Sequence, residues 1–249
     1  MSKIIVWDIE TTPIIANTWD LYPKYLSHDN IIQDWSIICG AWKEVGKETV
    51  HAVKIDTIGD DYAVVSKLRD VLAGADAIVH HNGDSFDIKK LNARLIYHNL
   101  PPLPKIPTID TKKEAKKIAA FTSNRLDYLS KFLCGEGKIH VEFGLWLDVM
   151  KGSKKALKEM VEYNKVDVIR LEEVYLRLRP YMKSHPHHGV LNGEDRNHSC
   201  THCGSTKVKR NGIRITAAGL KKQELQCQDC GAYSRVPVPK DDKKEKVGS

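Results

Sequence analysis

Acidic side chains near the ends of predicted strands and helices are the residues of this sequence best suited to chemistry. Asp8 and Glu10 lie two positions apart in the apolar run IIVWDIETT of residues 4–12. Residues 3–9 are predicted to form a buried strand, and the two-residue period of a strand places both carboxylates on one face. Open α/β sheets bind ligands at this end of their strands, so the pair could share one metal ion.

Two further groups of acids have spacings that suit a shared site. Tyr163 and Asp167 in YNKVD are four residues apart on a predicted helix and therefore share one of its faces. In HNGDSFD, residues 81–87, both Asp84 and Asp87 lie where a helix begins, and the helix dipole favours either one. Spacing does not choose between them, and each acid taken alone also fits an ordinary solvated position.

Together these acids suggest a cation site. Like charges repel, so a fold gathers carboxylates cheaply only when cations bind among them. If the fold brings the four acids together, the expected occupants are two divalent metal ions and the expected chemistry is phosphodiester cleavage.

The three motifs, in this order, resemble the DEDD superfamily of 3′–5′ exonucleases in its tyrosine-containing branch. The matching segments are WDIETT (residues 7–12), HNGDSFDIKKL (81–91) and YNKVD (163–167), and the middle one is similar to that of family B DNA polymerases. The resemblance selects Asp87 over Asp84 and covers roughly residues 1–182. We find no polymerase domain in the sequence, which predicts a free-standing nuclease.

The resemblance implies a ribonuclease H-like fold and a mechanism with two Mg²⁺ or Mn²⁺ ions. Asp8, Glu10 and Asp167 would hold the first ion, with Asp8 also reaching the second. Asp87 would act on the second ion through water, and Tyr163 would orient the attacking water.

The predicted elements agree with an α/β domain that has a mixed five-stranded sheet flanked by helices. Strands are predicted at 3–9, 35–43, 48–54, 76–81 and 106–110, and helices at 61–73, 85–98, around 126–133 and at 154–182; residues 138–152 are expected to be irregular. The predicted domain limits are 1–183 for the exonuclease domain, 184–199 for a linker, 200–236 for a zinc ribbon and 237–249 for a disordered tail.

Four of the six cysteines form two Cys-x-x-Cys pairs separated by 23 residues: Cys200 with Cys203, and Cys227 with Cys230. Four thiolates in this arrangement complete a closed tetrahedral zinc site, which is structural rather than catalytic. Cys39 and Cys134 lie singly in apolar stretches and are expected to be small core residues. The histidines of the linker could bind metal, but a solvated polar segment is the simpler interpretation.

The C-terminal segment resembles a zinc ribbon of the kind found near some transposases. Its basic residues would contact phosphates with little sequence preference. The residues predicted to bind nucleic acid are Lys207, Lys209, Arg210, Arg214, Lys221 and Lys222. The alternative is a zinc-stapled surface that docks a protein partner.

Composition is compatible with this interpretation. The chain has 249 residues and a net charge of +7, and no stretch approaches the ~20 apolar residues that span a bilayer. We expect a cytoplasmic protein that acts on nucleic acid, with DNA favoured over RNA. The alternatives are a structure-selective endonuclease or a ribonuclease on the same fold, and a non-catalytic nucleic-acid-binding protein.

Overall fold

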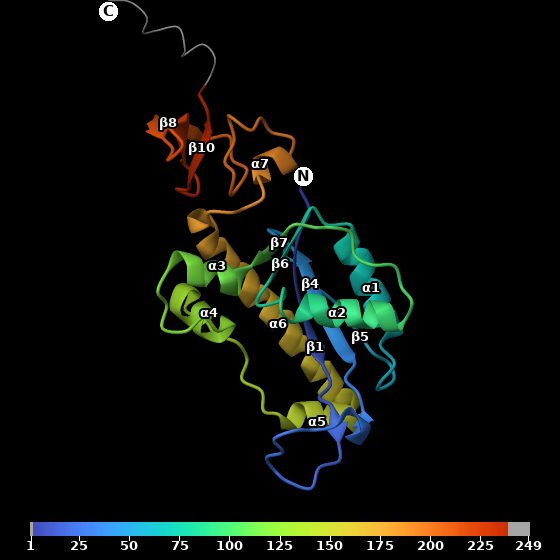
Figure 1. Ribbon diagram of the computed structural model, residues 1–249. Helices are drawn as coiled ribbons and strands as arrows, with labels where there is room; N and C mark the ends of the chain where they lie inside the picture. The colour runs from blue at the N-terminus through green and yellow to red at the C-terminus, as the bar shows by residue number, and fades with distance from the viewer. Residues whose placement is uncertain (1, 239–249) are drawn as a thin grey trace, which may run out of the picture. The chain divides into compact units, whose positions relative to one another are not determined.

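The computed structural model describes residues 2–238, which form two compact units (Figure 1). One consists of residues 3–174, and the other of residue 2 with residues 175–238. Most of the predicted tail, from residue 239 onward, lies outside the described residues. Within residues 2–238 no helix is both long enough and apolar enough to cross a membrane.

The larger unit is built on a mixed five-stranded sheet in the order β5-β4-β1-β6-β7. Its central strand β1 pairs antiparallel with β4 and parallel with β6, and β6 pairs parallel with β7. The strands are β1 Ile4–Thr11, β4 Ile37–Glu44, β5 His51–Lys54, β6 Ala77–His80 and β7 Thr108–Asp110. This topology confirms the predicted fold class.

Helices cover both faces of this sheet. Six helices belong wholly or in part to this unit: α1 Tyr62–Ala73, α2 Asp87–Tyr97, α3 Thr111–Ile118, α4 Leu126–Cys134, α5 Gly144–Met150 and α6 Lys154–Leu178. On one face α1 lies so close to β4 that a Cβ at Gly40 would come within 2.7 Å of Leu68 Cδ1. On the other face α6 is anchored by a buried ion pair between Glu172 and Lys43 of β4.

The register of β1 explains why this strand serves both core and site. Trp7 and Ile9 alternate with Asp8 and Glu10, and Ile9 pairs with Gly40 on the face that α1 covers. Trp7 and Ile9 are buried in the main apolar core. The alternate residues therefore face α6, so one strand supplies apolar packing on one side and carboxylates on the other.

One local prediction was wrong, and one predicted linker contains a short helix. Residues 138–152 were expected to be irregular, yet they contain α5, which buries Val149 in the core and places Trp146 against Tyr163. Residues 184–199 contain the short helix α7, His188–Leu191. Tertiary burial stabilises α5, and both helices are too short to show a helical period in the sequence.

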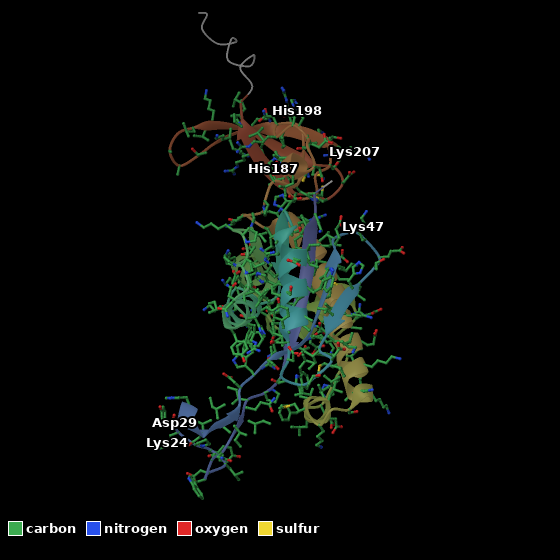
Figure 2. The ribbon with its side chains drawn as sticks, turned by 90° about the vertical axis from the view of Figure 1, so that its right-hand side faces the viewer. Lys24, Asp29, Lys47, His187, His198 and Lys207 are labelled. Atoms are coloured by element: carbon green, nitrogen blue, oxygen red, sulfur yellow. The ribbon has the colours of Figure 1, made fainter. Side chains whose placement is uncertain are left out.

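An arm between β1 and β4 extends away from the sheet, with Lys24 and Asp29 toward its far end in Figure 2. It contains the short strands β2, Ile15–Ala16, and β3, Ile31–Gln33, and the 3₁₀ turn His28–Asn30. The sequence pattern did not predict this arm, because two- and three-residue strands show no period.

The smaller unit contains a three-stranded antiparallel sheet in the order β10-β9-β8. These strands are β8 Val208–Ile215, β9 Lys221–Cys227 and β10 Tyr233–Pro237. The last turn of α6, the 3₁₀ turn Arg179–Tyr181 and α7 precede the sheet within the same unit.

Candidate active site

Three of the four predicted acids meet where β1 lies against α6. Asp8 and Glu10 from β1 and Asp167 from α6 each offer a carboxylate oxygen, and these oxygens lie within 4.8 Å of one another. Asp167 is almost fully buried, and its Oδ1 atom has no hydrogen-bond partner among the described residues. A buried carboxylate oxygen without a donor is the kind of atom that a bound cation would satisfy.

The fourth acid, Asp87, lies beside this trio at the first position of α2. Its buried carboxylate accepts hydrogen bonds from its own backbone N–H and from that of Ile9 on β1. The negative charge of Asp87 also contributes to the raised pKa of Asp8. Asp87 does not belong to the tight trio, but it is held next to it by the same strand.

Asp84 lies in a different environment. Its carboxylate pairs with Lys113 at 2.7 Å and faces the ring of His80 at 3.2 Å. His80, Asp84 and Asp110 also bring potential ligand atoms together, but Asp110 Oδ1 already accepts backbone N–H bonds from residues 82, 112 and 113. A lysine and backbone donors compensate Asp84 and one oxygen of Asp110, whereas Asp110 Oδ2 is buried and has no hydrogen-bond partner among the described residues.

The pKa values of the acids show that their charged forms are unfavourable when they lie close together and buried. Burial, followed by the charges of Asp87 and Asp167, holds the pKa of Asp8 well above its ordinary range. Burial and the neighbouring Asp167 raise the pKa of Glu10 to about 8, and burial raises the pKa of Asp87 to about 7. Without cations the site therefore favours bound protons, and divalent ions would replace them.

One cation of the protein reaches into the cluster. Lys138 forms an ion pair with Asp167, donates a hydrogen bond to the Tyr163 hydroxyl and lies 5.1 Å from the centre of the Tyr163 ring. Burial alone would lower the pKa of Lys138, but the charges of Asp167 and Asp8 outweigh it and raise that pKa. The ammonium group therefore stays charged at neutral pH.

Tyr163 is a hydrogen-bond donor in this network. Burial and the charge of Asp167 raise the pKa of Tyr163 to about 12, and its hydroxyl donates to the Asp167 carboxylate. The ring packs edge-on against Trp146 of α5, with ring centres 6.1 Å apart. The helix that the sequence did not predict thus positions a predicted site residue.

Asn164 and Lys138 were not among the predicted site residues. Asn164 is fully buried and donates from Nδ2 to Asp8 Oδ2 at 2.7 Å, which fixes the orientation of that carboxylate. A sequence signal existed for Asn164, because it lies three residues before Asp167 on the same helical face. No signal existed for Lys138, which lies in a loop without periodicity.

The four predicted zinc cysteines also come together. Their sulfur atoms lie within 4.8 Å of one another, with Cys200 and Cys230 3.6 Å apart and Cys203 and Cys227 3.5 Å apart. Both turns end in a glycine with positive φ, 79° at position 204 and 76° at 231, and each glycine N–H bonds back to the first cysteine carbonyl. The cluster fits one tetrahedral zinc ion.

The basic residues predicted to contact nucleic acid lie before or within β8 and β9, but their charges are not equally available. Lys207 lies 3.6 Å from Asp229, and Arg214 lies 3.0 Å from Glu224. Lys209 and Lys221 are exposed. The linker histidines belong to none of the three groups of potential metal ligands found among residues 2–238.

Comparisons with known proteins agree with this architecture. Residues 25–179 match the RNase_H_2 family, described as RNase_H superfamily. The chain is 27% identical over 146 residues to DNA polymerase III PolC-type from Ureaplasma parvum serovar 3, a match that covers 51% of this chain and 9% of that protein.

A solved structure gives the same picture of the fold. The family B DNA polymerase from the archaeon Pyrobaculum calidifontis superposes with a TM-score of 0.51 at 14% identity, covering 73% of this chain and 26% of that one. This chain therefore corresponds to only a small part of each of these polymerases. It belongs to the RNase_H superfamily.

Proposed function

We propose that the protein is a 3′–5′ exonuclease that hydrolyses DNA with two Mg²⁺ or Mn²⁺ ions. Membership of the RNase_H superfamily and the polymerase relatives support a metal-dependent nuclease. The observation that carries the proposal is the trio of Asp8, Glu10 and Asp167, whose carboxylate oxygens lie close together. Burial raises the pKa values of all three, so their charged forms are unfavourable unless cations bind beside them.

The residues fit a pair of divalent ions. Asp8, Glu10 and Asp167 would hold one ion, and Asp8 with Asp87 would hold the other, the latter through water. Bound there, the ions would lower the pKa of the attacking water and neutralise charge on the phosphate and the leaving 3′ oxygen. Carboxylate oxygens are the ligands that Mg²⁺ and Mn²⁺ prefer.

The side chains of the protein perform the remaining tasks. The Tyr163 hydroxyl, held by Asp167 and Lys138, would orient the attacking water. The charged Lys138 would stabilise the negative charge that develops on the scissile phosphate. Asn164 keeps Asp8 in one orientation and is therefore a positioning residue.

The ribbon would serve substrate binding. We propose that Cys200, Cys203, Cys227 and Cys230 hold one structural zinc ion and that basic residues of β8 and β9 contact phosphates. A protein partner at the same surface is the alternative.

Cleavage time courses test the proposal. Labelled single-stranded DNA, duplex DNA, closed circular DNA and RNA are incubated with Mg²⁺, with Mn²⁺ or with EDTA. We expect stepwise shortening of linear DNA from its 3′ end, dependence on the metal and an uncut circle. A nicked circle would instead identify an endonuclease, and faster loss of RNA would identify a ribonuclease.

A further inference from the structure

The smaller unit contains a cleft whose lining includes none of the six residues predicted to bind nucleic acid. It has a volume of about 920 Å³ and is bounded by β10 on one side and by residues 180–187 on the other. His187, labelled in Figure 2, lines it together with His202, one of the two residues between Cys200 and Cys203. Its volume is in the range of sites that enclose small organic ligands.

The charge of the cleft favours an anion. Lys183, Arg196 and Arg235 line it and are exposed. Neither Lys183 nor Arg196 forms an ion pair with any residue of the described range 2–238, so their charges are available. The lining also contains one acid, Glu224, which two arginines already neutralise at 3.0 and 3.7 Å.

The walls of the cleft also present flat aromatic rings. Tyr181 is 72% exposed and Tyr233 is 53% exposed, although both line the cleft. Aromatic rings beside cations are the arrangement with which proteins hold single-stranded nucleic acid, because bases stack on the rings while cations bind the backbone. A simple phosphate site would need no such rings.

Two histidines shape the wall of the cleft. His202 is 5% exposed, its Nε2 donates to the Met182 carbonyl at 2.8 Å, and its side chain also hydrogen-bonds with Cys200. His187 Nδ1 accepts from the Val190 N–H at 3.3 Å. The remaining ring nitrogens of both histidines are buried, so the cations and the tyrosines are the groups that a ligand in the cleft would meet.

We propose that this cleft binds an unpaired nucleotide segment of the nucleic acid substrate. A base offers a flat face for the tyrosines, and the phosphates of the strand suit Lys183 and Arg196. An acidic peptide would satisfy the cations but not the rings. A duplex would keep its bases inside. This inference rests on the proposed nuclease function, since that function brings nucleic acid to the protein.

Binding measurements on the full chain test the cleft. Fluorescence anisotropy is recorded with a labelled oligodeoxythymidylate of about 15 nucleotides, in an Asp8→Asn background that prevents cleavage. Substituting alanine for both Tyr181 and Tyr233 should weaken binding about tenfold or more. Arg196→Ala should weaken binding and make the salt dependence shallower by about one unit of slope. Both tyrosines are exposed, so these variants should keep their fold. The zinc content of each purified variant checks this, and we expect one zinc ion per protein.

Matched controls come from the larger unit. Tyr97, 68% exposed, and the exposed Lys67 lie on helices that do not line the cleft. Tyr97→Ala and Lys67→Ala should bind the oligonucleotide as the parent does. Three results would each overturn the proposal. The double tyrosine variant could bind the oligonucleotide as tightly as the parent, or it could lose the same affinity for blunt duplex DNA. Alternatively, polyglutamate could compete as effectively as unlabelled oligonucleotide.

A second assay separates this proposal from the nuclease proposal. Thymidine 5′-p-nitrophenyl phosphate contains a phosphodiester bond but no strand to occupy the cleft. The tyrosine variant with Asp8 intact should hydrolyse it at the parental rate, and a loss of this hydrolysis would contradict the separation of cleft and active site. If the parent protein hydrolyses no phosphodiester, the nuclease proposal is refuted. The oligonucleotide affinities would then still decide whether the cleft binds nucleic acid.

Discussion

Asp84 and Asp87 lie three residues apart, and helix geometry gives both a favourable place near the start of α2. Only the fold separates them: Asp84 is paired with Lys113, whereas Asp87 is held to β1 by the Ile9 N–H beside Asp8. The sequence pattern could not decide this, because the decision depends on a strand about 80 residues away.

Substituting these two aspartates tests their roles directly. Asp87→Asn should lower turnover on the order of 100-fold, because it removes a charge that would stabilise the second ion. Asp84→Asn is the matched control and should stay within a few-fold of the parent. Metal-dependent cleavage rates of linear single-stranded DNA measure both, and equal losses in the two variants would contradict the assignment.

Lys138 had no signal in the sequence, yet it contacts both Asp167 and Tyr163. Lys138→Ala should lower the single-turnover cleavage rate roughly ten- to hundredfold, since one charged donor to the transition state is lost. Lys131→Ala serves as control, because Lys131 is exposed and pairs with Asp127 on α4. A Lys138 variant that cleaves as fast as the control would exclude a role in the reaction.

At the scale of elements, β1 and α6 meet through carboxylates that repel each other, so their packing depends on pH. Glu10 and Asp87 have pKa values of about 8 and 7 in the fold, above the ordinary values of 4.5 and 3.8 that they regain on unfolding. The folded state therefore holds more protons between these limits. The stabilising contribution of these groups is complete below about pH 4 and is lost as pH rises through 7 to 8.

We expect the protein without added divalent ions to melt on the order of 5 °C lower at pH 8.5 than at pH 5.5. Mg²⁺ should reverse most of this loss at pH 8.5 and change little at pH 5.5, because protons occupy the site at the lower pH. Thermal melts followed by circular dichroism measure the effect. Glu10→Gln should flatten the pH dependence, and a variant with the parental dependence would refute this origin.

The start of α1 is held by a buried charge cluster. Asp61 is fully buried and accepts hydrogen bonds from both Nε and Nη2 of Arg94, from His98 Nε2 and from the Ile37 N–H, at 2.6 to 2.8 Å. Asp61→Ala should lower the free energy of unfolding by about 3–5 kcal/mol, because Arg94 loses its partner in a buried place. Urea denaturation measures the loss, and Asp56→Ala, at an exposed position, should change stability little.

The elements that the sequence pattern predicted are those with long apolar periods, such as β1, α1 and α6. Helix α5 was not predicted, because its seven residues are too few for a clear period and its stability comes from Val149 and Trp146 packing on other elements. The same reason applies to the short strands of the arm.

At the scale of the whole molecule, the chain combines a superfamily domain with a module that holds a cluster of four cysteines. Deleting residues 190–249 should weaken binding of single-stranded DNA about tenfold or more at low salt, because the module carries much of the positive charge. Hydrolysis of thymidine 5′-p-nitrophenyl phosphate should persist, since Asp8, Glu10, Asp87 and Asp167 all remain. Unchanged affinity at low salt would indicate that the module binds another partner.

The hydrogen bond from Asn164 to Asp8 joins positions 156 residues apart and has a consequence for synthesis. Asp8 and Glu10 leave the ribosome early, whereas Asn164 and Asp167 arrive only with α6. A nascent chain thus lacks one carboxylate of the trio and the group that orients another. The carboxylate cluster is therefore incomplete during synthesis and can form only after α6, the last long helix, has docked against β1.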